Sequence, residues 1–282
     1  MSIIVNHVSY SYNPDTPMES KALKDINLVI NDGEFLGLIG HTGSGKSTLV
    51  QHLNGLIKPT SGEIYYNGKD ISDSDFSLKK LRGDVGLVFQ YPEHQLFGED
   101  VFSDVCFGPI NKGLSKKDAE LKAFAALKQV GIEDEYFYQS PFDLSGGQKR
   151  RVAIAGVLAM EPDVLVLDEP TAGLDPAGRD EILEILNNIR KERGCSIVLV
   201  SHSMEDVADH ADRIVVMNKG SIIFDDVPRE VFKHARELDE IGLSVPEVTK
   251  AMVRLRKEGF DVDTDVINIS EAVETISKCF GI

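Results

Sequence analysis

The sequence predicts an α/β fold with a largely parallel sheet, for three reasons. Short apolar runs typical of buried strands occur at residues 35–39, 85–89, 164–167 and 197–200. Segments with apolar residues at helical spacing lie between these runs. A glycine-rich loop joins the first run to the first helical segment. Strands that alternate with helices in this way are typical of parallel sheets covered by helices.

Size and charge limit the kinds of protein this can be. With 282 residues, the chain is long enough for one large domain and a smaller appendage. Its net charge of −16 counts against a broad nucleic-acid surface or an electrostatic attachment to anionic lipid. A solvated acidic surface accounts for most of this charge. We therefore expect no nucleic-acid partner, and membrane association only through protein partners.

The terminus and the cysteines indicate where the protein works. The first residues, MSIIVNHVSY, lack a basic region followed by a long apolar core, and no apolar run approaches the length of a membrane span. Cys106, Cys195 and Cys279 are far apart and show no C-x-x-C spacing, which argues against a disulfide framework or a metal cluster. We expect neither signal peptide nor transmembrane helix, and a reducing cytosol as the setting.

Residues 40–48, GHTGSGKST, match the phosphate-loop pattern G-x-x-x-x-G-K-[ST] in full. Glycines let the backbone N–H groups point at an anion, and the following helix directs its positive end at the same place. Lys46 is expected to meet the β- and γ-phosphates and Ser47 to ligate Mg²⁺. The alternative, a glycine-rich surface loop, does not explain the strand before it and the helix after it. The expected binding residues are Gly40, His41, Thr42, Gly43, Ser44, Gly45, Lys46, Ser47 and Thr48.

Polar residues follow three of the predicted strands, at the edge where ligands bind in open α/β sheets. Gln90 is placed to reach a metal or a water molecule. Asp168 is expected to hold Mg²⁺, and Glu169 becomes the candidate general base. His202 lies within reach of the γ-phosphate. Taken singly, acids at a strand end and a lone histidine are more often structural; the phosphate loop favours the functional interpretation.

The segment LSGGQ, residues 144–148, precedes a helical pattern and forms a second candidate anion site. One chain has little use for two such sites. We therefore expect this one to serve ATP held by a second chain, although a Ser-Gly turn that caps a helix is the alternative. The residues concerned are Ser145, Gly146, Gly147 and Gln148.

Two loops and a helix leave alternatives open. Tyr12 lies between two predicted strands, residues 2–10 and 22–30, and is either a purine-stacking side chain or an exposed loop tyrosine. The loop at residues 91–98, YPEHQLFG, is either packed or a docking surface. A helix is predicted at residues 115–130, with its apolar face formed by Leu121, Phe124 and Ala125.

More than fifty residues follow Pro228. Ser244 and Glu247 have capping-box spacing before a helical stripe that ends at Gly259, and a last helix carries Val273, Ile276 and Phe280. Short helices bury little by themselves, so this tail is expected to pack on the main domain or on a partner.

In this order, the phosphate loop, Gln90, LSGGQ, VLVLDEP, GLD and His202 resemble the nucleotide-binding subunit of an ATP-binding cassette transporter. The resemblance covers residues 1 to about 228. It implies a P-loop NTPase fold with a RecA-like mixed sheet, an antiparallel β subdomain and an α-helical signature subdomain at about 91–160, followed by a helical extension at 229–282. The roles it implies are adenine stacking by Tyr12, a Mg²⁺ environment of Ser47, Gln90 and Asp168, a base at Glu169, a switch histidine at His202, nucleotide binding at Asp175, and completion of a partner's site by residues 144–148.

Three segments are similar to the ATPase of energy-coupling factor transporters: residues 40–48, 90–111 and 243–260. That resemblance implies import of vitamins or of cobalt or nickel ions by a complex at the cytoplasmic face of the membrane. Two ATPases, identical or homologous, would work under a transmembrane coupling protein and a small substrate-binding membrane protein. Residues 91–97 would receive the coupling protein, and the C-terminal helices would form a dimer contact.

Other functions remain as alternatives. The chain could energise another importer, for metal, amino acid or phosphate. A soluble cassette protein would need a long coiled coil or a second cassette, and the sequence contains neither. A nucleotide-gated binding module with little turnover is disfavoured by Glu169 and His202. The sequence does not identify the cargo.

Overall fold

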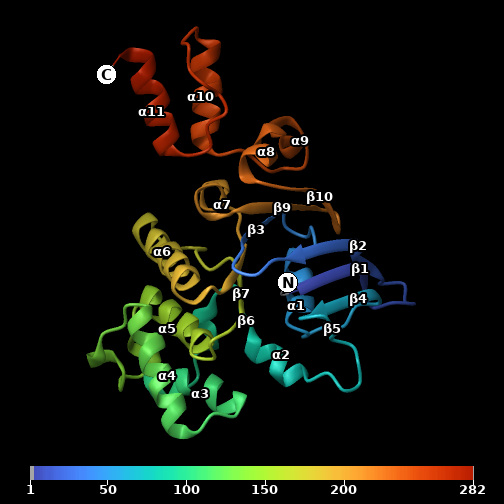
Figure 1. Ribbon diagram of the computed structural model, residues 1–282, viewed down its shortest axis with the longest axis vertical. Helices are drawn as coiled ribbons and strands as arrows, with labels where there is room; N and C mark the ends of the chain where they lie inside the picture. The colour runs from blue at the N-terminus through green and yellow to red at the C-terminus, as the bar shows by residue number, and fades with distance from the viewer. Residues whose placement is uncertain (1–2, 282) are drawn as a thin grey trace.

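The computed structural model describes residues 3–281, which form two sheets surrounded by helices (Figure 1). The strands are β1 (Ile3–Tyr12), β2 (Ser20–Ile30), β3 (Phe35–Ile39), β4 (Ser61–Tyr66), β5 (Lys69–Asp70), β6 (Val85–Val88), β7 (Val164–Asp168), β8 (Ser196–Val200), β9 (Arg213–Asn218) and β10 (Ser221–Asp226). The helices are α1 (Lys46–Leu53), α2 (Leu78–Asp84), α3 (Val101–Lys112), α4 (Lys116–Gln129), α5 (Gly146–Leu158), α6 (Pro176–Arg193), α7 (Met204–His210), α8 (Pro228–Lys233), α9 (Ala235–Glu240), α10 (Glu247–Lys257) and α11 (Ile269–Phe280). Short 3₁₀ turns are η1 (Pro92–Gln95), η2 (Asp134–Tyr136) and η3 (Pro141–Asp143).

The central sheet has the order β10-β9-β3-β8-β7-β6. All its neighbouring pairs are parallel except β9 with β10, which is antiparallel. Strands β3, β6, β7 and β8 are buried along their whole length, which explains why they are continuous apolar runs rather than alternating ones. The carboxyl ends of these strands meet at one edge, so this sheet positions the site.

The second sheet is antiparallel, with the order β2-β1-β4-β5. Its inner face, helix α1 and one face of the central sheet share a hydrophobic cluster that includes Ile26, Leu49 and Val166. The two strands predicted on either side of Tyr12 are β1 and β2, which pair antiparallel. A mixed central sheet, an antiparallel sheet and a group of helices confirm the predicted fold class.

Helices α3, α4 and α5 pack together on the other side of the central sheet, next to α6 (Figure 1). The helix predicted at residues 115–130 is α4, and Ser115 caps it as expected. Its predicted apolar face is wrong: Leu121, Phe124 and Ala125 are exposed, and three alanines with Leu127 are buried instead. Small side chains let α4 approach its neighbours closely, which hydrophobic size alone does not indicate.

The C-terminal helices α10 and α11 extend away from the sheets (Figure 1). Their own cluster has only four buried residues, Met252, Val262, Val266 and Ala272. Arg229 of α8 holds this extension through Glu271, at 2.6 Å, and through Asp265.

The predicted capping box of α10 is not formed. Pro246 precedes the helix without a side-chain cap, and the Ser244 hydroxyl donates instead to the carbonyl of Val245. Helix α10 begins at Glu247 with Pro246 as its N-cap residue, so Ser244 lies before the position from which a side chain caps the helix.

The three cysteines are unpaired, and two are buried. Burial raises the pKa of the Cys106 thiol to about 11 and that of Cys195 to about 12. Cys279, on α11, is partly exposed. Among residues 3–281, no helix is both long and apolar enough to cross a membrane.

Candidate nucleotide-binding site

The phosphate loop connects β3 to α1, as the sequence predicts. Gly45 precedes α1 with φ 107°, and a Cβ there would lie 2.6 Å from the carbonyl oxygen of Ala22. Only glycine fits such a position. Gly43 also has positive φ, at 81°, but a Cβ added there would meet no described atom within 4 Å. The loop therefore presents bare backbone to a space that a phosphate can approach.

Lys46 is buried at the first position of α1. Its ammonium donates to the carbonyl oxygens of Gly40, at 2.6 Å, and His41, at 3.2 Å. Burial lowers the pKa of Lys46 from its ordinary value, and the nearby carboxylates of Glu169 and Asp168 oppose part of that shift. A cation is thus held inside the loop, next to the acidic ends of the strands.

A cavity of about 480 Å³ lies over the phosphate loop. This volume suits a small-molecule ligand. The cavity brings together residues from the loop, from β1 and from the edge of the central sheet. Of the predicted site residues it is lined by Tyr12, Thr42, Gly43, Gly45, Lys46, Ser47, Thr48, Gln90, Glu169 and His202.

Tyr12 lies at the rim of this cavity, with 39% of its surface exposed. Its hydroxyl lies 3.1 Å from Oγ1 of Thr48, and the ring of Tyr10 meets its ring edge-on at 4.9 Å between centroids. These contacts hold the Tyr12 ring beside the phosphate loop, so Tyr12 is not a free loop tyrosine, and its stacking role stays a prediction.

Glu169 is the centre of the polar edge. It directly follows β7 and has φ 53°, in the left-handed region that non-glycine residues seldom occupy. One carboxylate oxygen accepts from Nε2 of Gln90 at 2.8 Å, and the other lies 2.8 Å from Nε2 of His202. Three side chains from three strand ends therefore meet at one point, as the sequence predicts.

The residues present suit a magnesium ion. The Ser47 hydroxyl and the Asp168 carboxylate make no hydrogen bond to another described residue, and Gln90 uses only its amide nitrogen, so its oxygen remains available. Hydroxyl, carboxylate and amide oxygens with phosphate oxygens are ligands that Mg²⁺ accepts. No group of three or more histidine, cysteine or acidic side chains arranged to hold a metal occurs in residues 3–281.

The segment at residues 144–148 does not join this cavity. Ser145 caps α5: its hydroxyl accepts from the N–H of Gln148 at 3.3 Å, and the Gln148 side chain accepts from the Ser145 N–H at 2.9 Å. Gly146 and Gly147 are exposed beside it. Helices α5 and α1 lie on opposite sides of β6 and β7 (Figure 1), so the two candidate anion sites of one chain face different places.

Asp175 also lies outside the cavity. Its carboxylate accepts from the N–H of Gly178 at 2.8 Å and caps α6. Within this chain its contact is therefore a helix cap, and the predicted nucleotide contact stays a prediction.

Sequence reasoning missed Arg150, a buried arginine that joins the segment after Gln90 to the segment after Glu169. The only signal for it is position, one helical turn beyond the Ser-Gly-Gly segment. Arg151 carries the same charge one residue later and is paired at the surface with Glu181, so charge alone does not distinguish the two.

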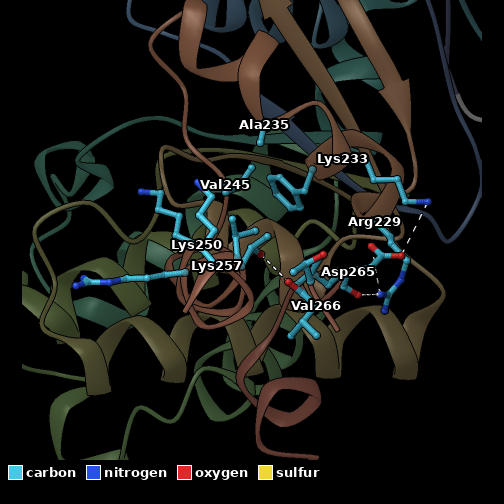
Figure 2. Close-up of a pocket in the computed structure, with 14 residues that line it drawn as sticks. Arg229, Lys233, Ala235, Val245, Lys250, Lys257, Asp265 and Val266 are labelled. Carbon is cyan, nitrogen blue, oxygen red and sulfur yellow. Dashed lines mark hydrogen bonds and ion pairs between the residues drawn. The ribbon is translucent and has the colours of Figure 1, made fainter. Parts of the chain in front are cut away.

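A larger cavity, of about 680 Å³, lies between α8 and α10 (Figure 2). Five basic side chains line it, among them Lys233 on one side and Lys250 and Lys257 on the other, and Asp265 is its acidic member. None of the predicted site residues contributes to it. This cavity is larger than the one over the phosphate loop, but its basic side chains are mostly exposed. We therefore do not assign it as the nucleotide site.

Comparison with known proteins shows the family of this chain. The family model described as ABC transporter matches residues 23–172, which include the phosphate loop, Gln90, residues 144–148 and Glu169. The cbiO1 protein of Clostridium perfringens, part of the ABC transporter complex cbiONQ, superposes with a TM-score of 0.76 at 40% identity over 91% of this chain and 96% of that one. The ATP-binding cassette MJ0796, solved as a post-hydrolysis dimer bound to ADP and Pi, gives 0.72 at 31% identity over 80% and 98%.

Curated relatives match over nearly the whole chain. The energy-coupling factor transporter ATP-binding protein EcfA2 of Caldanaerobacter subterraneus subsp. tengcongensis is 56% identical over 278 residues, 99% of this chain and 97% of its own. The protein of the same name from Clostridioides difficile is 52% identical over 280 residues, with the same coverage. The chain therefore belongs to the ABC transporter family, among the energy-coupling factor transporter ATP-binding proteins.

Proposed function

We propose that this chain binds ATP with Mg²⁺ and hydrolyses it to energise an energy-coupling factor importer. The observation that carries the proposal is the single cavity in which the phosphate loop faces Glu169, with Gln90 and His202 on either side of that carboxylate. A glycine-rich loop alone would serve many phosphate-binding proteins. A carboxylate held at the adjacent edge of the sheet adds the base that hydrolysis requires.

Each residue has a defined part in that reaction. Loop N–H groups and Lys46 hold the phosphates and balance their charge. Glu169 accepts the proton of the attacking water molecule, while Gln90 and His202 fix the direction of its carboxylate. Ser47, Gln90 and Asp168 would hold the magnesium ion, which supplies charge stabilisation on the phosphate oxygens when bound.

The complete site needs a second ATPase chain, identical or homologous. The exposed Gly146 and Gly147 with the N-terminus of α5 form an anion site that this chain's own phosphate loop does not use. In support, the MJ0796 cassette was solved as a dimer. ATP would therefore lie between the phosphate loop of one chain and residues 144–148 of the other.

The loop at residues 91–97 is the proposed docking surface for a transmembrane coupling protein. Tyr91 and Phe97 are exposed, and Phe97 meets the exposed Phe107 edge-on at 4.8 Å between ring centroids. These two phenylalanines line a groove of about 620 Å³ between the loop, α3 and α5. Helices of the coupling protein fit such a groove. Attachment to the cytoplasmic face of the membrane, beside a small substrate-binding membrane protein, would come through this contact.

The C-terminal extension is the proposed additional contact between the two ATPases. Ile269, Val273 and Phe280 are exposed on α11 at spacings that place them on one face. The extension buries only a small cluster of its own, so a partner surface is needed to cover this face.

The substitution Glu169→Gln tests the catalytic proposal. The amide keeps the shape of the side chain and cannot take a proton, so we expect steady-state ATP hydrolysis to fall by about 10²–10⁴-fold. ATP-dependent dimerisation should persist, because the phosphate loop and residues 144–148 are unchanged. Both are measured on the purified chain with its partner ATPase, by phosphate release and by size-exclusion chromatography; unchanged turnover would exclude Glu169 as the base.

Copurification tests the type of transporter. The full chain, tagged and isolated from membranes in mild detergent, should bring down a second ATPase, a coupling protein and a small membrane protein, identified by mass spectrometry. Recovery of two conventional permease subunits with a soluble binding protein would instead assign the chain to another importer for metal, amino acid or phosphate.

A further inference from the structure

The cavity between α8 and α10 has an apolar floor (Figure 2). Its volume of about 680 Å³ lies within the range of sites that hold small molecules. The floor is formed by the buried side chains of Phe232, Val245 and Val266. Phe232 also packs in the cluster that contains Val216 of β9, so this side of the cavity is fixed to the central sheet. An apolar body that enters the cavity therefore meets a surface that is already in place.

The rim of the same cavity is basic, so we call it the basic cavity. Its cations come from both helices, with Lys233 on one side and Lys250 and Lys257 on the other (Figure 2). The five basic residues that line it are Arg229, Lys233, Lys250, Arg254 and Lys257. Asp265 is the one acidic residue among the described residues that line it. The basic cavity therefore has an excess of positive charge around an apolar surface.

The charges on α10 are only partly compensated. Lys250 pairs with Glu247 at 2.6 Å, and Glu247 does not line the basic cavity. Arg254 and Lys257 make no hydrogen bond or ion pair with another described residue. These three side chains are exposed, so they are free to turn toward an anion that enters the cavity.

The spacing of these cations gives a second argument. Lys250, Arg254 and Lys257 recur at intervals of four and three residues, which places them on one face of α10. Like charges four residues apart destabilise a helix. Val253 also lines the cavity and is 37% exposed. An anion with an apolar body, bound over this face, would remove the repulsion and cover the valine.

Extended anionic surfaces do not suit the basic cavity. The net charge of −16 opposes a nucleic acid, because its phosphates would meet acidic protein surface beyond the cavity. The extension lies at the opposite end of the molecule from α3 (Figure 1), and α3 lines the groove proposed to receive the coupling protein. A lipid headgroup would therefore lie far from the cavity, whereas a small molecule meets neither obstacle.

We propose that the basic cavity binds a small organic anion that has an apolar body and a negatively charged group at each end. The body lies on the floor, one end meets Arg229 and Lys233 of α8, and the other end meets the cations of α10. No residue that lines the cavity over the phosphate loop lines the basic cavity, so this site is additional to the proposed ATP site. Because the ligand contacts both helices, it fastens the C-terminal extension to the main body.

Three probes test this chemistry on the purified full chain. Naphthalene-2,6-dicarboxylate has an apolar body with a carboxylate at each end, naphthalene-2-carboxylate has the same body with one carboxylate, and fumarate has two carboxylates without the rings. The chain contains no tryptophan, so naphthalene fluorescence reports binding directly, and calorimetry measures fumarate. We expect the dicarboxylate to bind saturably with a Kd of about 0.1–1 mM. The monocarboxylate should bind about threefold to tenfold more weakly, and fumarate at least about tenfold more weakly.

Two double variants locate the binding site. Arg254→Glu with Lys257→Glu reverses the two cations that have no partner, and it should raise the Kd of the dicarboxylate by at least about tenfold. Arg236→Glu with Lys278→Glu is the matched control, because it makes the same change of charge on residues that do not line the cavity. The control should keep the Kd within about twofold of wild type. All four side chains are exposed, so we expect both variants to fold.

Hydrogen exchange of the wild-type chain, followed by mass spectrometry, gives an independent location. The dicarboxylate should slow exchange in residues 228–267 and leave residues 40–48 unchanged. If Arg254→Glu with Lys257→Glu does not fold, this measurement decides: slowed exchange only outside residues 228–267 overturns the site.

Three further outcomes would overturn the proposal. They are no saturable binding of the dicarboxylate, equal Kd values for the two double variants, and equal binding of the monocarboxylate and the dicarboxylate. If the second ATPase alone slows exchange in residues 228–267 and the dicarboxylate adds nothing, the cavity is an interface between subunits and the proposal is wrong. None of these measurements needs ATP hydrolysis, so they test this site separately from the proposed function.

Discussion

At the scale of single residues, the side chains of the site hold one another in position. Glu169 is oriented by Gln90 and His202, and Tyr12 is braced by Tyr10 and Thr48. Preorganised contacts of this kind let a site react without first paying to order its groups. Supporting residues such as Tyr10 therefore determine how well the residues of the site are positioned.

His52 makes the folding stability depend on pH. It is fully buried on α1, with Nδ1 2.7 Å from the carbonyl of Thr48. Burial lowers its pKa below the ordinary 6.5, and that hydrogen bond opposes part of the shift. The folded protein therefore keeps His52 neutral, whereas the unfolded chain binds a proton as pH falls through about 6.5. Folding stability is lost in that window and below it, down to the folded pKa.

We expect wild type to lose more stability than His52→Asn between pH 7.5 and 5.5. Because His52→Asn also changes the free energy of unfolding at pH 7.5, the quantity compared is the change in that free energy with pH. Urea unfolding at pH 7.5, 6.5 and 5.5 measures it, and the other histidines cancel between the two proteins. Parallel curves for the two proteins would contradict a neutral buried His52.

At the scale of elements, helix N-termini carry the chemistry. Helix α1 directs its N-terminus at the phosphate loop, and we propose that α5 directs its own at the nucleotide of a second chain. The two differ in their caps: Gly45 leaves the start of α1 open, while Ser145 closes that of α5 within its own backbone. A nucleotide that reaches α5 must compete with this cap for the Ser145 hydroxyl.

Ser145→Ala should therefore have two effects. Loss of the cap should lower the free energy of unfolding by about 0.5–2 kcal/mol, and ATP-dependent dimerisation should weaken. Ser115→Ala is the control, because Ser115 caps α4 with a comparable hydrogen bond, 3.2 Å against 3.3 Å. It should show the stability loss alone. Equal dimerisation of the two variants would remove residues 144–148 from the partner's site.

At the scale of the whole molecule, one large body holds the site and a small extension projects from it (Figure 1). The sheets and their helices share extensive clusters, whereas the cluster of α10 and α11 has four buried residues and is joined to the rest of the chain by Arg229 and by the N–H of Glu247, which donates to Glu205. Stability of the extension is thus local, and its exposed apolar face is open to a partner.

Val273→Glu tests that face. Val273 is 58% exposed, so the substitution should leave the unfolding free energy within about 0.5 kcal/mol of wild type. It should weaken association with the second ATPase, measured by analytical ultracentrifugation without nucleotide. Lys278→Glu, a charge change of the same helix, serves as control. Unaltered association in Val273→Glu would exclude α11 from the dimer contact.

Much of the site followed from sequence because parallel strands end at a common edge. Gln90, Glu169 and His202 each come just after a buried apolar run, so their meeting required only that the runs be neighbours. What failed depended on packing. The buried face of α4 is formed by three alanines and Leu127, and α10 begins directly after Pro246, beyond the predicted cap residue Ser244. Arg150 and Arg151 are chemically alike, and only the tertiary fold decides which one is buried.

The three cysteines differ in accessibility, so one of them can carry a fluorescent label. Cys106 and Cys195 are buried thiols with strongly raised pKa values, and the thiolate is the form that reacts with electrophiles. Cys279 is the accessible one, on the helix proposed to meet the second ATPase. A maleimide dye applied to the native chain would consequently mark the extension selectively, so that its fluorescence follows the two subunits through the ATP cycle without any engineered cysteine.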